Sequence, residues 1–234
     1  MSAILRRELS SYFRSPLGYV FLAVFYVFSG YFFFAGTLYQ NSTDISVVFS
    51  SMFTIVLFII PLLTMRLFSE DKKYKTDQAL LTAPVSLPGM VMGKFLAALI
   101  VFIMGLAITI VFALVIASFA RPDWAKIVGN FTGLLLMGMA LTSIGAFISA
   151  LTENQMIAAI GGFASGLVLI IVDSLASVVQ NPVLSKIMVA LSFNNRYTDF
   201  TSGIFDLSNV VFFLSVCALF LFLTVRVFER RRWS

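Results

Sequence analysis

The sequence predicts an all-α membrane protein with six transmembrane helices, and three observations lead to this fold class. Of the 234 residues, 60% are hydrophobic and only 12% are charged, and the mean hydropathy is +1.00. So little charged surface cannot cover a soluble domain, and the bilayer must therefore be part of the solvent. The third observation is six apolar runs of roughly 18 or more residues, the length that crosses a hydrocarbon core of about 30 Å. These runs are Pro16–Tyr39, Val47–Met65, Gly93–Phe119, Ile127–Leu151, Met156–Val179 and Leu207–Val225.

Residues 1–15, before the first span, have the pattern of an amphipathic helix that stops at Pro16. Its apolar side chains are Ile4, Leu5, Leu9, Tyr12 and Phe13, and its charged side chains are Arg6, Arg7, Glu8 and Arg14. We expect this helix to lie on the inner surface of the membrane. A basic start before an apolar stretch also resembles a signal peptide, but the 24-residue run is long and lacks a small-residue cleavage site. We therefore expect it to be retained as a span.

Lysine and arginine are distributed unevenly between the two ends of the spans. With the N-terminus in the cytoplasm, twelve of the sixteen basic residues fall on the cytoplasmic side, including those of the basic tail 227–234. Loops rich in Lys and Arg stay in the cytoplasm. We therefore expect residues 16–226 to form a multi-pass domain in the bacterial inner membrane, with both termini cytoplasmic. The four basic residues left outside are Arg121, Lys126, Lys186 and Arg196.

Small residues recur at four-residue spacing in the fourth and fifth spans. They are Thr142, Ala146 and Ala150, followed by Ala158, Gly162 and Gly166. Such stripes let helix backbones approach closely in a bilayer. Packing inside the bundle is the expected role, and a dimer face is the alternative.

The longest loop, residues 66–92, joins the second and third spans and concentrates charge. Seven of the twelve residues from Arg66 to Asp77 are charged. Arg66 and Glu70 lie one helical turn apart and can form an ion pair, which is either a solvated surface pair or a contact that transmits motion from this loop. We interpret Lys94, at the start of the third span, as an anchor whose side chain reaches the inner headgroups.

A short helix is expected within this loop, presenting an isolated apolar patch to the cytoplasm. Its residues are Thr76 as N-cap, Asp77 and Gln78 in the first turn, Leu80 and Leu81 as the patch, and Pro84 as the stop. An apolar patch on a water-facing loop indicates a partner or the membrane surface.

Three features outside this loop invite a role. Asp173 lies toward the outer end of the fifth span, where it forms either a structural hydrogen bond or part of a translocation path or outer gate. Glu153, in a very short loop, can meet a partner or only water. In the outer segment 180–206, Pro182–Leu191 is too short to cross and suits an interfacial or re-entrant helix.

The charged loop carries a resemblance to a known family. The stretch Ser69–Ser86, with its acidic-basic cluster, Thr76, leucine-rich turn and Thr82-Ala83-Pro84-Val85-Ser86, followed by Gly93–Ala97, resembles the hallmark loop of ABC-2 type transporter permeases. Lys75 stands where that family usually has glycine, and Gln78 where it usually has glutamate.

A second resemblance indicates one branch within this family. Phe193–Leu214 and the ending Arg232-Trp233 are similar to the gliding-motility and NosY-like branch. The two resemblances and the six spans together cover nearly the whole chain.

The resemblance implies a permease subunit, most simply of an exporter, in which residues 76–84 dock as a coupling helix into a separate ATPase subunit. The coupling residues would be Glu70, Thr76, Asp77, Gln78, Leu80, Leu81, Thr82 and Pro84, and the interface helix would contribute Arg6, Arg7, Glu8 and Arg14. It also implies two permeases, identical or homologous, with two ATPases. It further implies ATP and Mg²⁺ in the ATPase, and an envelope accessory protein is a further candidate partner. The chain itself is not expected to be an enzyme or to bind a cofactor or metal.

The residues agree that nucleotide is handled elsewhere. The nearest approach to a P-loop, Gly89 to Phe95, has three residues between its glycines and no Ser or Thr after Lys94. There is no histidine, the one cysteine is Cys217, and Asp173 has no second carboxylate within its span, which disfavours an intramembrane enzyme. The net charge of +5 reflects cytoplasmic loops rather than nucleic-acid binding.

A second function remains open beside the permease. It is an ATP-driven membrane module that transmits motion to an envelope partner without moving a solute.

Overall fold

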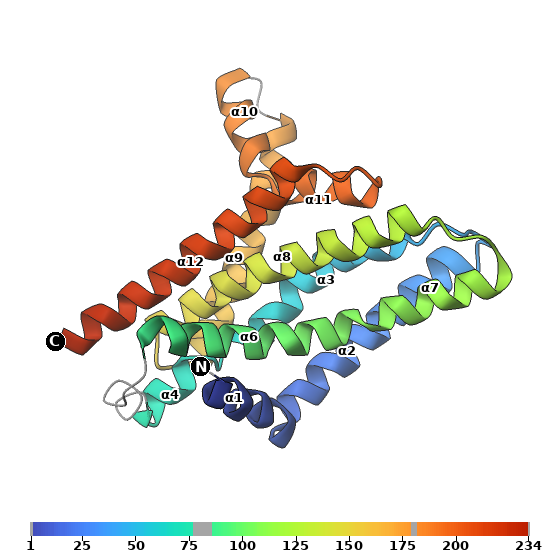
Figure 1. Cartoon of the computed structure of the whole chain (residues 1–234). Coiled ribbons are helices and arrows are strands. Elements are labelled where there is room, and N and C mark those ends of the chain that lie inside the picture. Colours follow the sequence, from blue (N-terminus) through green and yellow to red (C-terminus); the bar gives the residue numbers. More distant parts are fainter. Residues whose placement is uncertain (1, 77–85, 179–181, 234) are drawn as a thin grey trace.

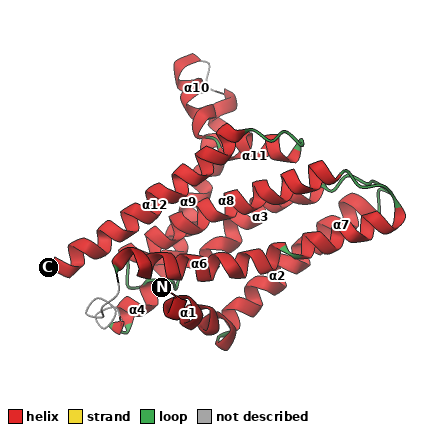
Figure 2. Ribbon diagram, in the orientation of Figure 1, coloured by secondary structure: helices red, strands yellow, loops and turns green. Residues whose placement is uncertain are grey.

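The computed structural model describes residues 2–76, 86–178 and 182–233 and is 86% helical, with no strand in these ranges (Figures 1 and 2). Six helical segments are long and apolar enough to cross a membrane. They are Pro16–Leu38, Ser46–Lys73, Leu87–Phe119, Trp124–Leu151, Gln155–Leu175 and Leu207–Arg231. The predicted fold class, an all-α polytopic membrane protein, is confirmed.

The chain begins with helix α1 (Ser2–Arg14), which meets α2 (Pro16–Phe33) at a sharp corner. Ser15 is extended there, with φ −101° and ψ 158°, because a residue that precedes proline is disfavoured in the helical region. Pro16 suits the first position of α2 because the missing N–H would have no helical partner. A Cβ on Gly18 would lie 2.7 Å from the carbonyl oxygen of Tyr12, so the corner needs glycine.

The remaining helices follow in chain order, with one π-helical turn, η1, that continues α2. They are η1 (Phe34–Leu38), α3 (Ser46–Thr64), α4 (Ser69–Lys73), α6 (Leu87–Leu106), α7 (Ile108–Phe119), α8 (Trp124–Leu151), α9 (Gln155–Val178), α10 (Pro182–Leu191), α11 (Phe193–Thr201) and α12 (Leu207–Trp233). Three span boundaries differ from the prediction by six residues or more. The second span continues through a turn to Lys73, the third begins at Leu87, six residues earlier than expected, and the last ends at Arg231, six residues later than expected.

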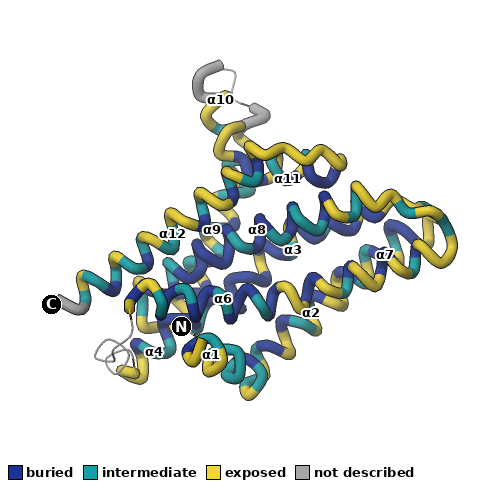
Figure 3. Tube along the Cα trace, viewed as in Figure 1, coloured by how far each residue is buried: buried dark blue, intermediate teal, exposed yellow. Residues whose placement is uncertain are grey.

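Helix α8 forms the centre of the bundle and packs against α3, α6, α9, α11 and α12. Figure 3 shows buried residues concentrated along α3, α6 and α8, whereas much of α12 is exposed. Small residues make this packing possible. A Cβ on Gly145 would approach the Thr64 side chain of α3, and one on Gly162 would lie 2.8 Å from Pro61 Cβ. Thr142, Ala146, Ala150 and Ala158 are also buried, so the predicted small-residue stripes pack inside the bundle.

The bundle has two ends. We call the end with both termini, α1 and α4 the terminal end, and the end with α10 and α11 the far end (Figure 1). Helix α10 occupies the segment where one short helix was predicted. Helix α11, which packs across α3, α8 and α9, was not predicted.

Candidate functional site

The terminal end holds a network of buried charges centred on Lys94 of α6. Its side chain is only 2% exposed, and its Nζ lies 2.7 Å from Asp71 Oδ2 and 3.0 Å from Glu8 Oε1. The same Nζ donates a 2.7 Å hydrogen bond to the carbonyl oxygen of Leu67. The interpretation of Lys94 as an anchor that reaches the headgroups is therefore wrong. The side chain turns into the protein because α1 and α4 supply two carboxylates there.

Arg7 of α1 extends this network to the surface. Its Nη2 lies 2.6 Å from Glu8 Oε1 and 3.6 Å from Asp71 Oδ2. Partial burial of Arg7 acts to lower its pKa, but the hydrogen bond and charge of Glu8, with the charge of Asp71, raise it overall. Two cations and two carboxylates thus connect α1, α4 and α6 through charge-assisted contacts.

A second group of contacts ties the turn after α3 to α1. Arg66 Nε pairs with Glu70 Oε2 at 2.7 Å, which confirms the ion pair expected from their spacing. The other guanidinium nitrogens donate to Ser15 Oγ at 2.6 Å and to Ser11 Oγ at 2.7 Å. Tyr12 is 2% exposed and its hydroxyl donates to the carbonyl oxygen of Leu63 at 2.8 Å.

The Tyr12 contact also shows what covers the apolar side of α1. Ile4 and Tyr12 are buried, and Leu5, Leu9 and Phe13 pack against the core. Burial raises the pKa of Tyr12 far above its ordinary value, so the phenol stays a donor. The apolar face predicted to lie on the membrane is thus covered by the chain itself.

Helix α4 is also attached to the centre of the bundle. Ser149 Oγ of α8 accepts hydrogen bonds from the N–H groups of Phe68 and Ser69, at 3.0 and 3.1 Å. Lys72, 6% exposed, donates to the carbonyl oxygen of Ala150, and its ammonium lies 5.7 Å from the ring centroid of Phe228 in α12. The first part of the charged loop is therefore held by α1, α6, α8 and α12 at once.

The coupling residues predicted from the sequence fall into two groups. Glu70 and Thr76 are described, and the Thr76 hydroxyl donates to Asp71 Oδ1 at 2.8 Å. The others, Asp77, Gln78, Leu80, Leu81, Thr82 and Pro84, lie outside the described residues. Lys75 has φ +56°, in the left-handed region. Glycine adopts this conformation without strain, which explains physically why glycine suits the position where Lys75 stands.

Other predicted site residues lie apart from this network. Arg6 and Arg14 of α1 are exposed. Glu153 contacts Arg231 of α12 at 3.3 Å, so it has a partner within the chain. Asp173 is near the far end, facing the start of α11. Its two carboxylate oxygens are shielded from solvent and face the Ser192 hydroxyl and the Asn194 N–H.

Sequence reasoning missed five contributors, Ser11, Ser15, Asp71, Lys72 and Ser149. The charge distribution indicates only that Lys72 lies on the cytoplasmic side. Among the described residues no group of three or more His, Cys, Asp and Glu could hold a metal ion. The arrangement connects α1, α4 and α6 through ion pairs.

The six apolar spans indicate an integral membrane protein. At one end of the bundle, buried ion pairs connect the charged loop to α1 and α6. The sequence model of the ABC-2 type transporter family matches residues 1–174, and the chain belongs to this family. It is thus a membrane component of an ABC transporter, a class that works with an ABC ATPase partner. A comparison with curated proteins found no match.

Proposed function

We propose that this chain is the permease subunit of an ABC exporter, and that the terminal-end network passes motion from the ATPase to the spans. The observation that carries the proposal is the double attachment of the charged loop. Its leading side, α4, is bonded to four other helices, and its trailing side continues directly into α6, which bears Lys94. A displacement of the loop cannot leave α6 and α1 in place without breaking buried ion pairs.

Such contacts suit the transmission of force. A buried charge that loses its partner costs about 3–5 kcal/mol, so the connected helices move together rather than separate. Lys94 contacts α1 and α4 simultaneously, so it couples the third span to both elements. We infer that residues 76–84 dock in a groove of the ATPase, which would hold the ATP and Mg²⁺.

The remaining features of the assembly are inferred from the family and the charge distribution. We propose that two copies of the chain, or one copy and a homologue, pair with two ATPases in the bacterial inner membrane. The excess of Lys and Arg at the terminal end supports cytoplasmic termini. The gliding-motility and NosY-like branch rests on Phe193–Leu214 and the Arg-Trp ending.

Docking is tested with the paired substitution Leu80→Asp and Leu81→Asp. The tagged chain is purified from its native membrane. A copurifying ATPase is recognised by peptides that contain a P-loop sequence and by ATP hydrolysis in the purified sample. The variant should insert normally and lose the ATPase. A matched control, Ile204→Asp with Phe205→Asp, changes two exposed residues toward the far end and should retain it. Equal recovery of the ATPase with the Leu80 and Leu81 variant would refute docking.

The projecting far end favours a second candidate function. Helix α10 stands away from the bundle in Figure 1, as a contact point for an envelope partner would. In that case the chain transmits motion without moving a solute. Stimulation of ATP hydrolysis by a substrate, together with its uptake into inverted vesicles, favours the exporter. Hydrolysis that responds only to the envelope protein favours the module.

Asp173 is proposed to contribute to the outer part of the translocation path. The Asp173→Asn variant should then assemble normally with altered turnover. Wild-type turnover would assign Asp173 a structural role.

A further inference from the structure

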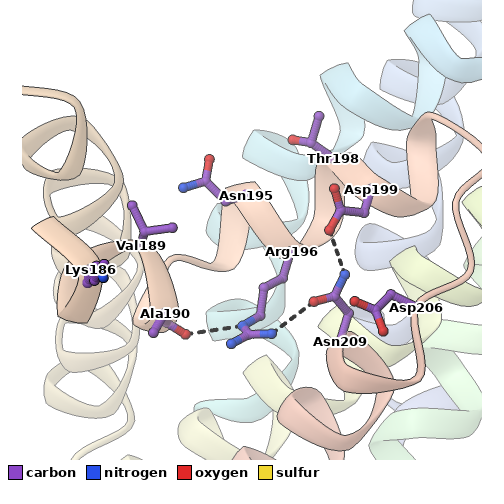
Figure 4. A pocket seen from close by; sticks show the side chains of 9 residues that line it. All are labelled: Lys186, Val189, Ala190, Asn195, Arg196, Thr198, Asp199, Asp206 and Asn209. Carbon is purple, nitrogen blue, oxygen red and sulfur yellow. Dashed lines mark hydrogen bonds between the residues drawn. The ribbon is translucent and has the colours of Figure 1, made fainter.

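The far end contains a cavity of about 660 Å³ that opens to the surface between α10, α11 and the start of α12 (Figure 4). It lies outside residues 1–174, the part matched to the family. Its charged lining residues are Lys186, Arg196, Asp199 and Asp206. None of them belongs to the terminal-end network, so the cavity can be considered apart from the proposed coupling.

Arg196 is held in place by several contacts at the floor of this cavity. Its Nε donates to the carbonyl oxygen of Ala190 at 3.1 Å, and its Nη1 donates to Asn209 Oδ1 at 2.9 Å. The guanidinium also lies 4.5 Å from the ring centroid of Phe212. No described residue accepts a hydrogen bond from Nη2, which leaves a fixed cationic donor available. Such preorganisation reduces the entropic cost of binding an anion.

The carboxylates are arranged on the other side. Asn209 is 3% exposed and donates from Nδ2 to Asp199 Oδ2 at 2.7 Å, which joins Asp199 to the Arg196 group. Asp206 Oδ1 accepts from the N–H of Ser208 at 2.9 Å. Figure 4 shows Lys186 on α10, Arg196 between the helices, and Asp199 and Asp206 beyond it.

Opposite charges thus line one cavity without neutralising each other. Within the described ranges, no ion pair joins Lys186 or Arg196 to Asp199 or Asp206. A ligand that carries an anionic and a cationic group would satisfy both sides.

The depth of the cavity indicates where such a ligand comes from. Asp206 and Asn209 flank the first residue of the last span, Leu207, so the cavity lies at the level of the lipid headgroups. Apolar side chains continue from its edge down the surface of α12, where Leu207 is 69% and Val211 is 55% exposed. Charged groups at headgroup depth above an apolar helix face match the two parts of a phospholipid.

We propose that this cavity binds the headgroup of a phospholipid that carries both a phosphate and a primary ammonium, as ethanolamine lipids do. The phosphate contacts Lys186 and Arg196, and the ammonium contacts Asp199 and Asp206. The acyl chains lie along the exposed face of α12. A free phosphoethanolamine has the same headgroup chemistry but lacks the contact with α12.

The test is native mass spectrometry of the purified full-length chain with equal concentrations of three palmitoyl-oleoyl lipids. Phosphatidylethanolamine should bind at least about tenfold more tightly than phosphatidylglycerol, which has no ammonium, and phosphatidylcholine, whose quaternary ammonium donates no N–H. Equal binding of the three lipids would overturn the proposal. Soluble phosphoethanolamine is the fourth probe, and displacement of the lipid at equimolar concentration would overturn the assignment to a lipid.

Substitutions at two exposed residues test the phosphate contact and the ammonium contact separately. Lys186→Gln should weaken both phosphatidylethanolamine and phosphatidylglycerol several-fold. Asp206→Asn retains a side chain that can accept from Ser208 and should weaken only phosphatidylethanolamine, so that the selectivity falls. Arg121→Gln, another exposed cation outside this cavity, is the control and should bind as the wild type does. Unchanged selectivity in the Asp206→Asn variant, or unchanged binding of both lipids by the Lys186→Gln variant, would contradict the proposal, whatever the outcome of ATPase copurification.

Discussion

Replacement of Lys94 by methionine perturbs the terminal-end network at its centre. Methionine keeps most of the length and volume of the side chain and removes only the charge and its donors. The change deprives Asp71 of its contact at 2.7 Å and Glu8 of its contact at 3.0 Å, and leaves the Leu67 carbonyl without its donor. Because Asp71 and Glu8 side chains are only 17% and 14% exposed, water compensates poorly for the loss.

The magnitude follows from which partners remain. Removal of one member of a buried ion pair costs about 3–5 kcal/mol. After the change, Arg7 still contacts Glu8 at 2.6 Å but lies 3.6 Å from Asp71. Asp71 is therefore the carboxylate that keeps the weaker contact with a cation. We therefore expect Lys94→Met to reduce the free energy of unfolding by about 3 kcal/mol, at the lower end of that range.

The assay is unfolding of the purified chain by SDS titration in mixed micelles, followed by circular dichroism. Asp71→Asn in the Lys94→Met background should recover part of the loss, with a coupling energy of about 1–3 kcal/mol in the double-mutant cycle. A single variant within about 0.5 kcal/mol of the wild type, or a strictly additive cycle, would show that the ion pair does not hold α4 to α6.

Three further comparisons test the packing and the loop. Gly145→Ala places a Cβ 2.8 Å from Thr64 Cβ and should lower the free energy of unfolding by about 1–3 kcal/mol. Gly30→Ala is the control and should leave stability unchanged, because a Cβ there meets nothing within 4 Å. Equal melting temperatures of the two variants would contradict the close α3–α8 packing. Lys75→Gly should be about 1 kcal/mol more stable than Lys75→Ala, because only glycine adopts φ +56° without strain, and identical midpoints would argue against this backbone conformation. Arg66→Lys should lower the free energy of unfolding by about 2 kcal/mol and speed proteolysis near α1, because one ammonium cannot replace three directed guanidinium nitrogens. An unchanged digestion rate would show that Arg66 does not hold α1.

The parts predicted correctly from the sequence depend on local spacing. Apolar runs indicated the six spans, four-residue spacing indicated the small-residue stripes, and the interval from Arg66 to Glu70 indicated their ion pair. Each of these signals is contained within one helix, where the geometry is fixed by 3.6 residues per turn. The corner at Ser15 and Pro16 is local in the same sense.

The network itself could not be predicted because its members are distant in the chain. Nothing near Lys94 indicates that Glu8 will be its partner, and a lysine at a span end ordinarily reaches the headgroups. Helix α11 was missed for another reason, since its residues are largely polar and give no apolar run. Its start carried one usable signal, because Ser192 caps the helix by accepting from the Asn195 N–H at 3.0 Å.

Labelling of single cysteines tests most directly whether an ATPase can reach the network. In a Cys217→Ala background, which removes the one native cysteine, Lys73→Cys reports on the terminal end and Thr43→Cys on the opposite end of the bundle. Both positions are exposed. Our account predicts that a membrane-impermeant maleimide labels the Thr43 variant in intact cells and the Lys73 variant only after permeabilisation. Labelling of the Lys73 variant in intact cells would place α4 beyond the reach of any cytoplasmic ATPase and contradict the account.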